Sequence, residues 1–160
     1  MANYTKEIAH MLDRMNTKIL MQDKSGYFKK NLKIKLNLVE LLLLKQLGEQ
    51  GEVKMNDLIK SLEIDRNLMT TTVKRLSGLK LIQKKTDQLD GRSQICYLLP
   101  QGVDLYQALL EEQRKELEFI LSDVTINEEK TILKFISKMV QYHTEKYEIK
   151  PNEAQKHEGN

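Results

Sequence analysis

The sequence is poor in the residues that build disulfide-bonded, metal-binding and all-β proteins. Its 160 residues include one cysteine, two prolines and no tryptophan. A lone cysteine excludes an intrachain disulfide and a cysteine-based zinc site. No apolar run, the four-leucine block Leu41–Leu44 included, approaches the roughly 18 residues of a membrane helix, and the N-terminus has no basic start followed by an apolar stretch. These absences predict a mainly helical cytoplasmic protein without a bound metal and without a membrane partner.

The chain nevertheless has enough apolar residues for one packed domain. Hydrophobic residues make up 40% of the sequence, which argues against global disorder. The net charge is only +3, but a nucleic-acid-binding protein needs local rather than overall positive charge, so this balance permits such a function without indicating it. There is no glycine-rich phosphate loop, Gly-x-Ser-x-Gly motif or recognisable serine–histidine pairing, so we expect neither an enzyme nor a cofactor.

Long amphipathic helices are predicted at both ends of the chain. In residues 5–22 one apolar stripe recurs at helical spacing, and two more helices are expected over about 101–123 and from Asn127 onward. These stripes have little local partner surface. We therefore expect the helices at about 5–22 and 101–147 to bury them in a homodimer. Residues 150–160 are polar and predict a frayed tail.

The middle of the chain, about residues 37–100, predicts a compact head. Asn37 and Glu40 have the spacing of a capping box, at the start of a helix that we expect to end at Gly48. A short helix follows around Met55.

The next predicted helix, from Asp65 to about Leu79, has two opposed faces. Asp65 is a suitable N-cap. At about 100° per residue, one face collects the apolar residues Met69, Val73 and Leu76. The other collects small hydroxyls, an amide and an ammonium group, on Asn67, Thr70, Thr71 and Lys74. Such groups suit the phosphates and base edges of DNA, whereas the alternative is a plain solvent-exposed face.

A basic hairpin is predicted directly after this helix. Strands are expected near 82–87 and 92–99, and Asp90-Gly91 between them is a strong hairpin signal. Arg92 lies at the tip of that turn. A reading helix followed by an arginine-tipped wing is typical of DNA-binding proteins.

The chain resembles the MarR family of transcriptional regulators over about residues 5–147. The wing of that family carries Asp-x-Arg, and its last strand ends in Leu-Thr-Pro-x-Gly; the counterparts here are Asp90-Gly91-Arg92 and Leu98–Gly102. The helix-turn-helix pattern of the family also fits residues 55–62, 65–70 and 74–76.

The resemblance implies a mainly α fold with a small β-hairpin wing, in which a winged helix-turn-helix head joins a long-helix dimerisation region within one MarR-like domain of residues 1–160. It implies a dimer that binds a palindromic operator in double-stranded DNA, acting as a repressor until a small-molecule effector releases it. The effector pocket would lie between the dimer region and each head. Met11 and Met15 are candidate lining residues, although such a stripe also suits a plain dimer core.

Two residues depart from the family pattern. Leu99 replaces the usual threonine and removes a side-chain cap from the next helix, a loss of about 1 kcal/mol. Lys80 occupies a position that is often glycine, so the turn before the wing is expected to differ slightly.

Within this interpretation each candidate DNA-binding residue has an expected role. Base readout is assigned to the small polar side chains Asn67, Thr70 and Thr71. Arg92 would enter the minor groove. The remaining basic side chains would position the DNA backbone: Arg66, Lys74, Arg75, Lys84 and Lys85. Asp90 and Gly91 would support the wing. Because a carboxylate repels phosphate, Asp90 is expected to order the turn and to pair with Arg92 or Arg75.

Several features leave alternatives open. Cys96 could sense oxidants, but its mid-strand position favours a half-buried filler. His10, His143 and His157 have no metal-ligand spacing among themselves. The whole chain could also be a winged-helix adaptor that binds proteins and never DNA.

Overall fold

The computed structural model of the protein describes residues 4–27 and 34–147. Helices and strands follow one another there in the order α1 (Thr5–Ser25), α2 (Leu38–Gln50), β1 (Val53–Lys54), α3 (Met55–Leu62), α4 (Arg66–Gly78), β2 (Ile82–Thr86), β3 (Gln94–Leu98), α5 (Pro100–Ile120) and α6 (Ile126–Tyr147). The fold is mainly helical with a small sheet, as predicted. The chain divides after Leu110 into two compact units. The expected tail at 150–160 lies outside the described residues.

Helix α2 begins with the predicted capping box and ends later than predicted. The Asn37 side chain accepts a hydrogen bond from the Glu40 N–H, and the Glu40 carboxylate accepts one from the Asn37 N–H, both at 2.9 Å. The helix runs to Gln50 and is followed by Gly51 at φ 79°, so the expected end at Gly48 is wrong. Gly48 serves packing instead, because a Cβ atom there would lie 2.4 Å from the Tyr106 ring.

Helix α4 is fixed at both ends by local hydrogen bonds. The Asp65 carboxylate accepts a bond of 2.8 Å from a first-turn N–H, which confirms the predicted cap. At the other end the Leu81 N–H donates to the Leu76 carbonyl and the Lys80 N–H donates to the Ser77 carbonyl, both at 3.0 Å. These two bonds define a Schellman motif, which needs a left-handed residue. Lys80 takes that conformation at φ 58°, where glycine is the usual choice.

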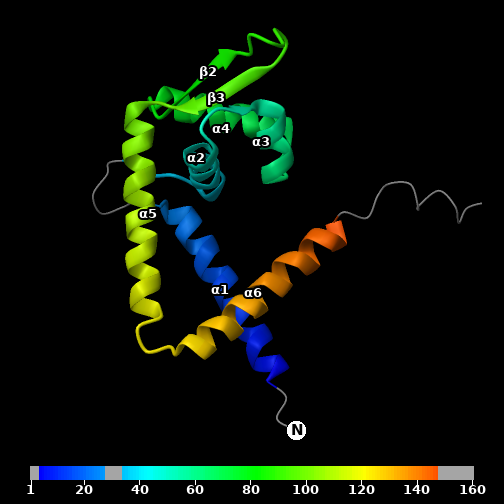
Figure 1. Cartoon of the computed structure of the whole chain (residues 1–160), viewed down its shortest axis with the longest axis vertical. Helices are drawn as coiled ribbons and strands as arrows, with labels where there is room; N and C mark the ends of the chain where they lie inside the picture. Colours follow the sequence, from blue (N-terminus) through cyan, green and yellow to red (C-terminus); the bar gives the residue numbers. More distant parts are fainter. Residues whose placement is uncertain (1–3, 28–33, 148–160) are drawn as a thin grey trace, which may run out of the picture. The chain divides into compact units, whose positions relative to one another are not determined.

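The three strands form an antiparallel sheet in the order β1-β3-β2. Strands β2 and β3 make the predicted wing hairpin (Figure 1), and β3 contacts α2 and α3 while β2 contacts α4. Cys96, in the middle of β3, is paired with Lys84 of β2 and with Val53 of β1. Strand β1 has only two residues, too few for an alternation pattern, and was not part of the sequence-based prediction.

The core of the first unit lies among α2, α3, α4 and the sheet. Its fully buried side chains include leucines of the three helices, Leu36 and Leu81 outside them, and Met69, Val73, Ile82 and Cys96. Helix α5 approaches this core at Gly102, where a Cβ atom would lie 2.0 Å from the Leu81 carbonyl oxygen. The same carbonyl accepts a 2.9 Å hydrogen bond from the Leu99 N–H. The Pro-x-Gly at 100–102 therefore combines a helix start with a close backbone contact.

The second unit contains the end of α5 and all of α6. The Thr125 N–H donates to the Glu128 carboxylate at 2.8 Å, and the Glu128 N–H donates to the Thr125 hydroxyl at 3.4 Å. This capping box starts α6, so the prediction that Asn127 caps the helix is wrong. No side chain over 111–145 is fully buried, and Phe119 and Val140 are 81% and 61% exposed. Among the described helices, none combines the length and the apolar character that crossing a bilayer demands.

Candidate nucleic-acid interface

Helix α4 presents the two faces that its sequence predicts. The apolar residues Met69, Val73 and Leu76 are at most 1% exposed and pack into the core. The polar side chains on the opposite face are all exposed: Asn67, Thr70, Thr71 and Lys74. The buried face locks the helix to the head, and the polar face is left free for a partner.

The two threonines on this face use their hydroxyl protons within the helix. The Thr70 hydroxyl donates to the Arg66 carbonyl at 2.8 Å, and the Thr71 hydroxyl donates to the Asn67 carbonyl at 2.9 Å. Each oxygen keeps its capacity to accept a hydrogen bond, and each methyl group remains available for apolar contact. These threonines can therefore accept from amino groups of bases or touch a thymine methyl, but they are poor donors.

A basic pocket of about 130 Å³ joins the start of α4 to the loop end of the wing. It is lined by Lys54, Met55, Asn56, Arg66, Arg92, Ser93 and Gln94. The Arg66 guanidinium donates a 3.0 Å hydrogen bond to the Asn56 side-chain oxygen, which orients it at the pocket. The fold thus brings together Arg66 and Arg92, which are 26 positions apart. Lys54 and Asn56 belong to the same surface and were not predicted, because only the pairing of β1 with β3 places them there.

The wing turn is ordered by Asp90, as predicted. Its carboxylate accepts hydrogen bonds from the Arg92 N–H at 3.1 Å and from the Ser93 hydroxyl at 2.7 Å. These two bonds, the Ser93 bond foremost, lower the pKa of Asp90. In the described part of the chain Asp90 forms no ion pair with Arg92 or Arg75, so that part of the expectation is wrong. The exposed Arg92 guanidinium is left available for a partner.

The turn differs from a two-residue hairpin. The strands stop at Thr86 and resume at Gln94, so a seven-residue loop, 87–93, connects them. Gly91 is not among the positive-φ residues of the described chain, and it therefore does not form the expected tight turn with Asp90. Gly91 is exposed, and a side chain there would meet nothing within 4 Å.

Asp87 braces the other side of this loop and was missed at the sequence level. Its carboxylate accepts a 3.0 Å hydrogen bond from the Leu89 N–H and forms a 3.0 Å ion pair with Lys54. The hydrogen bond from Leu89 is the main cause, and the bond from Lys54 the second, of the lowered pKa of Asp87. The residue is only 6% exposed. From the sequence alone, a carboxylate in a loop is expected to be solvated. The role of Asp87 becomes visible only when the fold brings the distant Lys54 to face it.

The two lysines of the wing, Lys84 and Lys85, differ in whether their charge is paired. Lys85 forms an ion pair with Glu52, and its ammonium lies 5.3 Å from the centre of the Tyr97 ring. Lys84 is exposed and belongs to no ion pair within the described ranges. A phosphate at Lys84 would therefore bind an unpaired positive charge, whereas a phosphate at Lys85 would compete with the Glu52 carboxylate.

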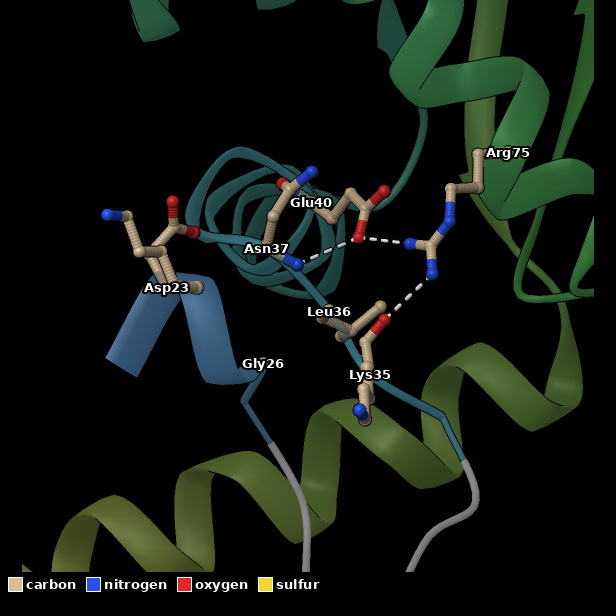
Figure 2. Close-up of a pocket in the computed structure, with 8 residues that line it drawn as sticks. Asp23, Gly26, Lys35, Leu36, Asn37, Glu40 and Arg75 are labelled. Atoms are coloured by element: carbon tan, nitrogen blue, oxygen red, sulfur yellow. Dashed lines mark hydrogen bonds and ion pairs between the residues drawn. The ribbon is translucent and has the colours of Figure 1, made fainter. Parts of the chain in front are cut away.

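Arg75 is held against the start of α2. Its guanidinium pairs with the Glu40 carboxylate and donates a 2.8 Å hydrogen bond to the Lys35 carbonyl (Figure 2). Glu40 is only 2% exposed, and the same oxygen accepts the Asn37 N–H of the capping box. A buried carboxylate requires such a partner. Arg75 therefore positions α4 on α2, and its contact with DNA phosphates stays a prediction.

The remaining candidates lie apart from this surface. Met11 and Met15 on α1 are 56% and 50% exposed, and neither lines the two pockets shown around Arg66 and Arg75. Cys96 is 0% exposed, more deeply buried than predicted, and its sulfur lies 3.1 Å from that of Met55. Burial raises the pKa of the Cys96 thiol to about 11. Over the described ranges, no three His, Cys, Asp or Glu side chains gather into a metal site.

The head, which contains the candidate interface, is the part of the chain that matches a known protein family. Residues 36–94 match the model of the MarR family. This segment, 59 of the 160 residues, is similar to the MarR family. It contains the polar face of α4, the basic pocket and most of the wing, so the candidate interface lies almost entirely within the MarR match. No curated protein matches the chain.

Solved structures extend the likeness beyond the matched segment. FabT of Streptococcus pneumoniae in complex with DNA superposes with a TM-score of 0.74 at 15% identity, over 89% of this chain and 99% of that one. A probable transcriptional regulator from Pseudomonas aeruginosa gives 0.65 at 23% identity, over 86% and 99%. PcaV of Streptomyces coelicolor, in complex with its natural ligand, gives 0.65 at 15% identity, over 88% and 96%. At these identities the likeness shows a shared fold.

Proposed function

We propose that the protein is a cytoplasmic transcriptional regulator that binds a palindromic operator as a homodimer, with α4 in the major groove and the wing at the minor groove. The observation that carries this proposal is the joint exposure, in one unit, of the polar α4 face and the basic pocket lined by Arg66 and Arg92. The MarR match and the likeness to a DNA-bound FabT support it. Repression, and release by a small-molecule effector, are the further parts of the proposal.

Exposed apolar side chains support the dimer. The predicted stripe on α1 comprises Ile8, Met11, Leu12, Met15 and Ile19, and all of these except the half-buried Leu12 are 37–56% exposed. α6 carries a comparable set, with Leu133 and Ile136 at 66% and 51%. Apolar surface of this extent is typical of an interface, and a two-fold dimer would place two reading helices on a palindrome. Sedimentation at micromolar concentration should give twice the chain mass, and a monomer would contradict the proposal.

DNA binding is tested by titrating a random duplex at increasing salt. Four of the candidate DNA-binding cations in each head lie outside the ion pairs of the described residues: Arg66, Lys74, Lys84 and Arg92. A dimer would then neutralise about eight phosphates, and affinity should fall about 10⁴-fold between about 50 and 200 mM salt. Lys138→Ala, in the second unit, is the matched control and should leave the slope unchanged. Failure to bind duplex at low salt would favour the adaptor hypothesis.

A further inference from the structure

Leu89 stands out from the other exposed apolar residues of the protein. It is 98% exposed, whereas the other large hydrophobic residues that are exposed in the described chain range from 36% to 81%. Most of those lie on α1, α5 and α6, where the proposed dimer would cover them. Leu89 lies in the loop 87–93 at the outer end of the wing hairpin (Figure 1), and that dimer does not account for it.

The loop holds Leu89 and Arg92 in the same way. In the sequence Asp87-Gln88-Leu89-Asp90-Gly91-Arg92, each aspartate accepts the N–H of the residue two positions later. Each of these bonds closes an Asx-turn. The turn at Asp87 fixes the backbone at Leu89, and the turn at Asp90 fixes the backbone at Arg92. The tip therefore carries one apolar and one cationic side chain on a backbone that is braced before contact, which lowers the entropic cost of binding.

The charges around the tip favour a polyanionic partner. Asp87 is compensated by its ion pair with Lys54, and both Asp90 oxygens accept hydrogen bonds from the turn. Arg66 and Arg92 line the pocket beside this loop, and Lys84 is exposed on β2. An apolar side chain beside an arginine matches the chemistry of the minor groove, where arginine follows the negative potential and leucine can enter between base pairs.

We propose that Leu89 is a wedge that inserts from the minor groove between two neighbouring base pairs, next to the site of Arg92. This inference rests on the proposed DNA-binding function. Insertion unstacks one step and bends the duplex, and pyrimidine–purine steps such as TA and CA deform most readily. Leu89 would thus select the sequence under the wing through the deformability of DNA, without any hydrogen bond to a base.

The test uses operator duplexes recovered by selection from a random pool, with 2-aminopurine placed in turn at each position under the wing. Wild-type protein should raise the 2-aminopurine fluorescence at one step in each half-site. Leu89→Ala should abolish that rise and weaken binding about tenfold, a loss of roughly 1.4 kcal/mol, with an unchanged salt slope. Leu89→Met, which keeps an apolar side chain of similar size, should retain the rise. Gln88→Ala, at the exposed neighbour, is the matched control.

The outcomes separate this proposal from the proposed function. If wild type binds duplex and Arg92→Ala weakens binding, DNA binding stands. A Leu89→Ala variant with wild-type fluorescence and affinity then overturns the wedge alone. Weaker binding with the fluorescence rise retained also overturns it, because Leu89 would then touch the groove without entering the stack. If wild type binds no duplex at low salt, both proposals are wrong.

Discussion

Replacing Lys80 by glycine should stabilise this protein. Lys80 is the left-handed residue of the Schellman motif that ends α4, at φ 58°. A side chain in this region costs about 1–2 kcal/mol, while glycine gives back about 0.5–1 kcal/mol through the entropy of the unfolded chain. Lys80 is exposed, so its side chain contributes little packing. The net expectation for Lys80→Gly is a gain of about 0.5–1 kcal/mol in the free energy of unfolding.

The assay is thermal and urea unfolding at one fixed protein concentration, because dimerisation would make Tm depend on concentration. The gain corresponds to a rise of about 1–4 °C in Tm for a chain of this size. Lys80→Ala keeps the strained φ and should show no gain. Lys84→Gly, in strand β2, should lose about 0.5–1 kcal/mol. A Lys80→Gly variant that is destabilised as much as Lys84→Gly would refute the reasoning, because the left-handed backbone would then carry no cost for lysine.

Three further predictions concern the head. Arg92→Ala should weaken operator binding while leaving the unfolding free energy within about 0.5 kcal/mol, and unchanged affinity at physiological salt would remove the wing arginine from the interface. Alanine at Thr70 or Thr71 should relax base preference at a few operator positions, whereas Lys74→Ala should weaken all sequences alike and reduce the salt slope by about one; a binding-site selection on the three variants distinguishes these results. Cys96 should be dispensable for regulation, so wild type and Cys96→Ala should both stay on DNA under oxidant. The wild-type thiol has a pKa of about 11, and about one part in ten thousand is thiolate at pH 7. Release of wild type but not of the variant by peroxide would contradict this.

The parts of the head that could be predicted from the sequence are those fixed by neighbours along the chain. The faces of α4, the capping box at Asn37 and the Asp65 cap each depend on spacings of a few residues. The wrong prediction of a helix end at Gly48 also came from local sequence, because a glycine late in a helix resembles a C-terminal cap. The actual role of Gly48 depends on packing against Tyr106, 58 positions away.

Long-range contacts account for the parts that the sequence did not reveal. Strand β1 exists because Val53 and Lys54 pair with β3, and this pairing also brings Lys54 to Asp87 and into the pocket with Arg66. The sequence offers no spacing from which to read such pairings. The seven-residue wing loop has the same origin, since buried Asp87 and its distant lysine hold a wider turn than Asp90-Gly91 would make alone.

The same contacts change how the basic residues of the head should be counted. The sequence treats Arg75 and Lys85 like Lys74 and Lys84, as cations facing phosphates. In the structure Arg75 compensates the buried Glu40 and Lys85 pairs with Glu52. To bind a phosphate, either side chain must leave a carboxylate. Glu40 would then remain buried with the Asn37 N–H but without a cationic partner, at a cost of several kcal/mol. If the head binds DNA as proposed, its affinity should depend on fewer cations than the sequence contains, and Arg75 should act mainly through the position that it gives to α4.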